Sequence, residues 1–184
     1  MRNEQAISGT AHRGTLAEEA LEALFVHTER ALYNVVYRWT WDREDTSEIV
    51  QEAFARLWGM RSRVDLPRAR ALLFRIALNL AASRRRWRRV RRFVGLDHAA
   101  ELDSTPLAEE AMIERQRAHR VQAAIDSLPE PLRRTLVLCE LTPMTHEEIA
   151  RVLGTRPGTV GSRRHAALAR VRCALQTGGD DARA

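Results

Sequence analysis

Residues 48–58, EIVQEAFARLW, carry apolar side chains at the spacing i, i+1, i+4, i+5, i+8 and i+9. This spacing forms a single stripe along an α-helix, which turns once in about 3.6 residues, whereas a half-buried strand would alternate. No stretch of the chain alternates over a useful length, and no Asn-Gly or Asp-Gly dipeptide marks a hairpin. The sequence therefore predicts an all-α fold. We expect further helices at residues 21–40, 70–90, 110–126 and 131–141.

The C-terminal part, residues 144–175, contains a second local pattern. Thr145 followed by Glu148 predicts a capping box at a helix start, Gly154 predicts the end of that helix, and Pro157 suits the first turn of the next. A short helix, a glycine turn and a longer helix are typical of a helix-turn-helix, whose second helix enters the major groove of DNA. A helical hairpin without a DNA-binding role remains the alternative. The candidates for DNA contact are Arg156, Thr159, Ser162, Arg163 and His165.

The charge of the chain is unevenly distributed. The formal net charge is +6, and residues 1–95 contribute +7, residues 96–114 contribute −6 and residues 115–184 contribute +5. The acidic stretch contains Pro106 and little helical periodicity before it, so we expect a flexible linker between two basic lobes. It is either a solvated spacer or a segment that keeps out of nucleic acid or imitates it. Basic lobes of this kind favour polyanionic partners.

Several classes of protein are excluded by what the sequence lacks. It has no run of about 20 apolar residues and no apolar N-terminal signal, so we expect a cytoplasmic protein without membrane insertion. Cys139 and Cys173 lie in apolar helical patterns without a CxxC motif, and we expect buried, inert thiols. The scattered histidines form no ligand pair, and no nucleophile–base pair or phosphate loop appears. We therefore expect neither an enzyme nor a bound cofactor or metal.

Three segments together resemble the extracytoplasmic-function (ECF) group of bacterial sigma-70 factors. DTSEIVQEAFARLW (45–58) is similar to that group's D-x-x-D-L/I-V-Q-E-x-F-x-R-L/V-W/Y motif, and LLFRIALNLAASRRRW (72–87) resembles its W-L-x-x-I-A-x-N-x-x-x-D-x-x-R segment. Residues 128–168 resemble its C-terminal domain in the L-P, E-E-I-A, L-G and G-T-V-x-S-R-x-H positions. The resemblance covers roughly residues 20–175, in the family's order.

The resemblance implies a domain organisation and a function. Residues 21–95 would form a domain 2-like unit that binds the polymerase core and the minus-ten promoter element, and residues 115–176 a domain 4-like helix-turn-helix unit that binds the minus-thirty-five element. Residues 1–20 and 177–184 would be flexible ends, and the acidic linker would join the two units. The protein would be a dissociable subunit that directs RNA polymerase to promoters and assists strand opening.

The partners follow from the same resemblance. They are the RNA polymerase core, through the clamp helices of its largest subunit and its flap, and promoter DNA in duplex and single-stranded form. An anti-sigma factor is a further implied partner, although nothing in the sequence identifies one. Two other functions stay open: a stand-alone helix-turn-helix regulator, against which the 45–58 motif argues, and an inactive homologue that acts as a protein-binding decoy.

Site residues are carried over from the matching motifs. The expected core-binding residues lie mostly on the polar side of the 48–58 helix, whose alternative role is an ordinary solvated face. They are Asp45, Glu48, Gln51, Glu52 and Arg56. For the minus-ten element, the arginines of SRRRWRRVRR (83–92) would bind phosphates and Asn79 would read a base. The expected set is Arg75, Asn79, Ser83, Arg84, Arg85, Arg86, Arg88 and Arg89, with Trp87 as a core residue rather than a stacking platform.

Some positions depart from the family's pattern and leave the promoter sequence open. They are Leu72, Ser83, Gly161, Arg164 and Ala166. Arg164 lies about 40° around the helix from Val160, on the expected buried side. We therefore expect its stem to cover the core and its guanidinium to pair with Glu147 or Glu148, while Arg163 contacts DNA.

Overall fold

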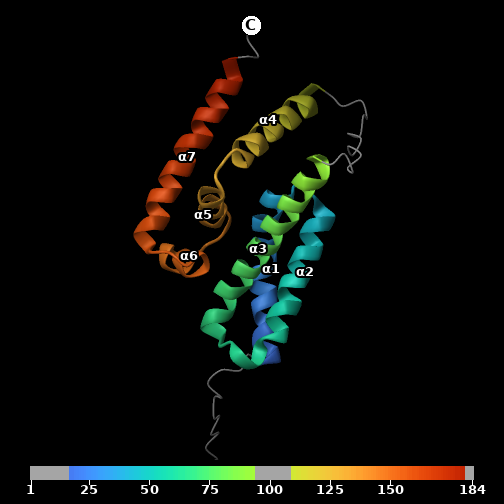
Figure 1. The fold of residues 1–184 in the computed structure, drawn as a ribbon, viewed down its shortest axis with the longest axis vertical. Coiled ribbons are helices and arrows are strands. Elements are labelled where there is room, and N and C mark those ends of the chain that lie inside the picture. The colour runs from blue at the N-terminus through green and yellow to red at the C-terminus, as the bar shows by residue number, and fades with distance from the viewer. Residues whose placement is uncertain (1–16, 94–108, 181–184) are drawn as a thin grey trace, which may run out of the picture.

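The computed structural model describes residues 17–93 and 109–180, and within these ranges the chain is helical and contains no strand. Figure 1 shows α1, α2 and α3 side by side, with α5, α6 and α7 along one flank and α4 above α5. The helices are α1 (Glu18–Thr40), α2 (Arg43–Gly59), α3 (Leu66–Phe93), α4 (Glu109–Asp126), α5 (Glu130–Leu141), α6 (His146–Leu153) and α7 (Pro157–Asp180), with a short 3-10 helix at Arg61–Arg63. The predicted all-α fold is confirmed.

Helices α1, α2 and α3 form a three-helix unit, the N-terminal bundle. The apolar stripe predicted for α2 is buried from Ile49 to Leu57, and Trp58 is half-buried. Leu32 of α1 and Phe74 of α3 are fully buried in the same core. Burial of an apolar side chain of this size stabilises a fold by about 1.5–3 kcal/mol, which explains why the three helices pack on their apolar sides.

Helices α4 to α7 form the C-terminal unit, which contains the predicted helix-turn-helix. The side chain of Thr145 accepts a hydrogen bond from the backbone N–H of Glu148, whose carboxylate in turn accepts from the N–H of Thr145 at 2.7 Å. Gly154 ends α6 in the left-handed conformation with φ 63°, and α7 begins at Pro157. The predicted capping box, glycine turn and second helix are therefore present.

The two units pack against each other. Helices α4 and α5 contact α1, α6 contacts α3, and one apolar core continues from the N-terminal bundle into Val137, Ile149 and Val160 of the C-terminal unit. A second, smaller cluster of Leu128, Leu136 and Ala167 lies between α5 and α7.

Some expected boundaries fall on described residues and others do not. The expected linker lies mostly in residues 94–108, outside the described residues, and its last part, 109–114, belongs to α4. Helix α7 continues to Asp180, past the expected domain end at 176. Most of the expected N-terminal segment, residues 1–16, also lies outside the described residues.

The glycine turn generates a stability prediction. Gly154→Ala should lower the free energy of unfolding by about 1 kcal/mol, because alanine is strained at a positive φ. Gly158→Ala is the matched control: Gly158 lies in the first turn of α7 with no atom within 4 Å of an added Cβ, so this change should raise stability by roughly 0.5 kcal/mol. Thermal and urea denaturation measure both, and equal effects of the two substitutions would contradict the assignment of the turn.

Candidate nucleic-acid interface

The outer face of α2 is polar and exposed. Glu48, Gln51, Glu52 and Arg56 are all exposed, and Arg56 donates a hydrogen bond to Glu52 at 2.6 Å. Four of the five expected core-binding residues therefore share one accessible face.

Asp45 does not belong to this face, contrary to expectation. It is only 6% exposed, because it lies one helical turn before Ile49 and so on the buried stripe of α2. Its carboxylate bridges Arg84 and Arg88 of α3, with 2.5 Å between Asp45 Oδ1 and Arg84 Nη1 and between Asp45 Oδ2 and Arg88 Nη2. A buried carboxylate needs such partners, since an unpaired charge would be costly to bury.

The same two arginines bind further acids at the start of α2. Arg84 Nη2 lies 2.9 Å from Glu48 Oε2, and Arg88 Nη2 lies 3.1 Å from Asp42 Oδ2. Asp42 also accepts a hydrogen bond from the backbone N–H of Asp45, as the N-cap of α2. This backbone bond is the main reason that the pKa of Asp42 is lowered; burial opposes the shift, and Arg88 adds to it. Arg84 and Arg88 therefore attach α3 to α2.

Another side of α3 faces the C-terminal unit. Arg75 donates hydrogen bonds to the backbone carbonyls of Val152 and Arg151 at the end of α6, where carbonyl groups lack helical partners. Asn79 Oδ1 accepts a hydrogen bond from Arg134 of α5 at 2.9 Å. The side chain expected to read a base is therefore bonded within the chain.

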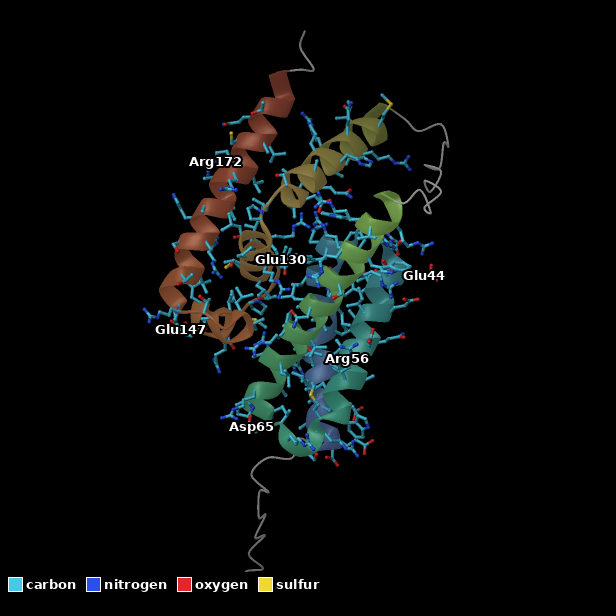
Figure 2. All side chains as sticks on the ribbon, in the orientation of Figure 1. Glu44, Arg56, Asp65, Glu130, Glu147 and Arg172 are labelled. Carbon is cyan, nitrogen blue, oxygen red and sulfur yellow. The ribbon has the colours of Figure 1, made fainter. Side chains whose placement is uncertain are left out.

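The arginine run continues this pattern. Arg85 donates to the Asp126 carboxylate at 2.9 Å and to the Asp126 carbonyl at 3.1 Å. Arg86 donates to Ser83 Oγ at 3.0 Å and lies 4.0 Å from Glu130, which Figure 2 labels on α5. Arg89 lines a cavity of about 320 Å³ together with Arg84, Arg85 and Arg88, and with Trp39 and Trp41.

The expectation that Trp87 is a core residue was wrong, and so was the expectation that both cysteines are buried. Trp87 is 56% exposed, with the Arg91 guanidinium 4.5 Å from its ring centre, because the buried side of α3 ends at Ala82. Cys139 is half-buried, and burial raises its pKa, but Cys173 is exposed on α7.

The helix-turn-helix residues lie on α7 and the turn before it. Arg156, Ser162 and His165 are exposed, and Thr159 and Arg163 are half-buried. Ser162 Oγ donates to the Thr159 carbonyl at 3.1 Å, so its hydroxyl already has a partner. All five expected residues belong to the same end of α7 or the preceding turn, which is the arrangement that a recognition helix needs.

Arg164 pairs with an acid, but not with either of those expected. Its Nε lies 2.8 Å from Glu140 of α5, and this pair raises the pKa of Arg164. Glu148 instead binds Arg70 of α3 at 3.3 Å and completes the cap of α6. The side chain of Arg164 is 43% exposed, so its guanidinium reaches the edge of the unit as expected.

Sequence reasoning missed a group of residues where the two units meet. Arg133 is only 1% exposed, with its guanidinium 2.9 Å from Asp126 and 5.2 Å from the ring centre of Trp39. Arg133 precedes Val137 by one helical turn, so it occupies the apolar stripe of α5. This position on the apolar stripe was the feature of the sequence from which the burial of Arg133 could have been predicted.

Residues 17–93 and 109–180 contain no group of three or more His, Cys, Asp or Glu side chains that could hold a metal ion. No helix in these ranges has the length and apolar character to cross a membrane.

Comparison with protein families gives two matches, in chain order. Residues 24–99 match Sigma-70 region 2, and residues 118–171 match Sigma-70, region 4. The region 2 match thus corresponds to the N-terminal bundle, and the region 4 match corresponds to the part of the chain that contains the helix-turn-helix.

Individual relatives agree with this assignment. The chain is 32% identical to the RNA polymerase sigma-E factor of Streptomyces coelicolor over 166 residues, covering 87% of this chain and 89% of that protein. It is 31% identical to the ECF RNA polymerase sigma factor SigE of Mycolicibacterium smegmatis over 141 residues, although it covers only 54% of that protein's length. Among solved structures, CnrH in complex with the cytosolic domain of CnrY is similar with a TM-score of 0.67 and 25% identity, over 88% of this chain and 90% of that one.

The Asp42 pair generates a pH prediction. Because the pKa of Asp42 is lowered by folding, its stabilising effect is present above the ordinary value of 3.8 and is lost as the pH falls through the lower folded value. Asp42→Asn keeps an acceptor for the helix cap but removes the charge that faces Arg88. The variant should therefore melt at a lower temperature than the parent at neutral pH, and this difference should shrink below about pH 4. A difference that stays constant over the titration would contradict the assignment.

Proposed function

We propose that this chain, which belongs to the ECF group of bacterial sigma-70 factors, directs RNA polymerase core to promoters through its two helical units. The observation that carries the proposal is the presence, in one chain, of an exposed polar α2 face and a capped helix-turn-helix, each within its matching sigma-70 region. An exposed polar helix face can occur without a helix-turn-helix, and a helix-turn-helix can occur without such a face. Their combination in one chain is the pattern of a subunit that binds both a polymerase and DNA.

The α2 face is the proposed site for the polymerase core. Glu48, Gln51, Glu52 and Arg56 are exposed, and the fold does not need them for its apolar core. Polar helix faces of this kind can dock on a partner through complementary charges. Asp45 would act indirectly, because it is buried and holds Arg84 and Arg88 in position.

The proposed DNA contacts divide between the units. On α3, Asn79 would read a base of the minus-ten element, while Arg75, Ser83 and the arginines 84–86, 88 and 89 would bind phosphates. Exposed Trp87 offers an aromatic surface for an unstacked base, which replaces the core role expected for it. On α7 and its preceding turn, Arg156, Thr159, Ser162, Arg163 and His165 would contact the minus-thirty-five element.

The chemistry belongs to the polymerase, and this subunit would form no bond itself. It would act where the polymerase acts, in the cytoplasm. An anti-sigma factor is a further proposed partner, because the similar protein CnrH was solved together with the cytosolic domain of a second protein, CnrY. The acidic stretch 96–114, most of which lies outside the described residues, would follow the path of the transcript and be displaced by it.

A run-off transcription assay tests the proposed function. Purified core should initiate at a defined start site only when the protein is added, and the protein alone should bind promoter duplex weakly. Tight, sequence-specific binding of duplex by the free protein, without stimulation of core, would favour a stand-alone regulator.

The α2 face generates a prediction about core affinity. Glu52→Lys should weaken binding to core by about tenfold, because a reversed charge at a complementary interface is repelled. The variant should stay folded, since Glu52 is exposed and forms an ion pair with Arg56 on its own helix, so no hydrogen bond or ion pair to another described helix is lost. Glu29→Lys makes the same charge change on an exposed position of α1 and should bind core like the parent. Equal affinities of the two variants would remove this face from the core interface.

The recognition helix generates a second prediction. Arg163→Ala should reduce binding of the holoenzyme to promoters that contain the upstream element by about tenfold or more, the usual effect of one lost base or phosphate contact. Arg164→Leu should have little effect there, because Arg164 is paired with Glu140. Both variants should melt near the parent temperature. A stable Arg164→Leu protein that no longer uses the upstream element would show that Arg164 contacts DNA.

A further inference from the structure

Gly161 lies inside α7, the expected recognition helix, where glycine is unfavourable. Its neighbours are Val160, which is buried, and Ser162, which is exposed. Glycine in a helix interior destabilises the helix relative to alanine, because it loses more conformational freedom on folding. Among the glycines that the structure describes, only Gly154 has a positive φ. The backbone of α7 therefore does not require a glycine at position 161.

The imidazole of His146, on α6, occupies the space that a side chain at position 161 would enter. A Cβ atom added to Gly161 would lie 3.8 Å from His146 Cε1 and 4.0 Å from His146 Nδ1. These are ordinary van der Waals distances, so a methyl group fits there without strain. A longer side chain would run into the ring. Position 161 of α7 is thus covered by a side chain that comes from α6.

Position 161 is at the border between the buried and the exposed side of α7. A helix turns by about 100° per residue, so Gly161 lies about 40° around the helix from His165 and about 100° from both Val160 and Ser162. His165 and Ser162 are exposed candidates for DNA contact, whereas Val160 is fully buried. His146 is itself exposed at this border. Its ring therefore lies next to the side of α7 that is proposed to enter the major groove.

The main chain of His146 is fixed on both sides. His146 is the first residue of α6, within the capping box of Thr145 and Glu148, and Ile149 of the same helix is fully buried. Figure 2 labels the next residue, Glu147, near the first turns of α7, against which α6 packs. A side chain on such a fixed backbone loses little freedom when it binds a partner, and this favours a specific contact.

The chemistry of the ring suits a base edge. Among the residues that the structure describes, the ring nitrogens of His146 have no hydrogen-bond partner. Imidazole always carries an N–H donor, which matches the major-groove acceptors of guanine and the N7 of adenine. A phosphate is a poorer partner, because the exposed carboxylate of Glu147 follows directly in the chain and would repel it.

We propose that His146 reads a base pair of the upstream, minus-thirty-five promoter element from α6, at the place that residue 161 leaves open on α7. Glycine and histidine act as a pair: Gly161 admits the ring to the side of the recognition helix, and His146 supplies the donor. The proposal rests on the proposed function of the helix-turn-helix and adds a residue from its first helix to the five on α7 and the preceding turn.

The test uses holoenzyme assembled from core and the full chain, with a pool of duplex DNA of randomised sequence. Sequencing of the retained duplexes gives the base preference at each position of the upstream element. His146→Ala should reduce the preference at one position by about threefold or more, the effect of one lost hydrogen bond, and leave the other positions unchanged. Weaker binding by the same factor on all sequences is the mark of a phosphate contact and would overturn base reading by His146.

Substitutions at Gly161 probe the same contact from α7. Gly161→Gln should displace the ring and change the preferred base at the position that His146→Ala affects. Gly161→Ala should keep the parent's preference and raise the melting temperature, because alanine favours the helix and its methyl group fits beside the ring. In the His146→Ala background no ring is left to displace, so the effects of Gly161→Gln and His146→Ala should not add. Additive effects at two different promoter positions would contradict the pairing.

His119→Ala is the matched control, because it makes the same chemical change at an exposed position of α4. It should keep the parent's preference at every promoter position. His146→Ala should melt near the parent temperature, since the capping box uses the side chains of Thr145 and Glu148. If circular dichroism shows that His146→Ala does not fold, the two Gly161 variants decide the question.

A folded His146→Ala holoenzyme with the parent's preference at every position would overturn the proposal. Failure of the proposed function is a different result. In that case the parent holoenzyme would select no upstream element from the pool, and Arg163→Ala would leave its DNA binding unchanged.

Discussion

Arginine–carboxylate pairing along α3 is the interaction on which the arrangement of the other helices depends. Arg84 and Arg88 share the buried carboxylate of Asp45 and thereby hold the start of α2, while Arg85 binds Asp126 and holds the end of α4. Guanidinium groups suit this task because their planar, multiple donors can bind two acceptors at once and stay charged when partly buried. A single basic helix therefore joins both units of the molecule.

This double use explains why such a basic helix is compatible with a stable fold. Arg84, Arg85 and Arg88 of α3 are paired with carboxylates of α2 and α4, so part of the positive charge of this helix is neutralised within the chain. Phosphates and carboxylates are similar ligands for arginine, since both accept charge-assisted hydrogen bonds from its guanidinium group. The pairs to α2 differ, because Asp45 is buried and its release would leave an unpaired charge. We therefore infer that Arg84 and Arg88 are the less available part of the run.

Local sequence patterns predicted most helices and the helix-turn-helix, because helix spacing, the Thr145–Glu148 cap and Gly154 act within a few residues of one another. The same spacing could have placed Asp45 and Arg133 correctly, since each lies one turn from a buried apolar residue. The burial of Trp87 was predicted wrongly, because aromatic character alone does not show where the neighbouring helices end. The sequence did not identify the acid that pairs with Arg164, because acids occur on both preceding helices: Glu140 on α5, and Glu147 and Glu148 on α6. Only the packing of α5 against α7 places Glu140 beside Arg164.

The sequence by itself determined the all-α class, the positions of the helices, the helix-turn-helix and, through three ordered motifs, membership of the sigma-70 family. The tertiary structure decided which charged groups meet. The pair of Arg84 with Glu48 joins residues 36 positions apart, and the bond from Trp41 to Asp126 joins residues 85 positions apart. Helix signals act over about four residues and carry no information on such distances. The register of these pairs is set only when the helices pack, which is why the junction between the units became visible in the structure alone.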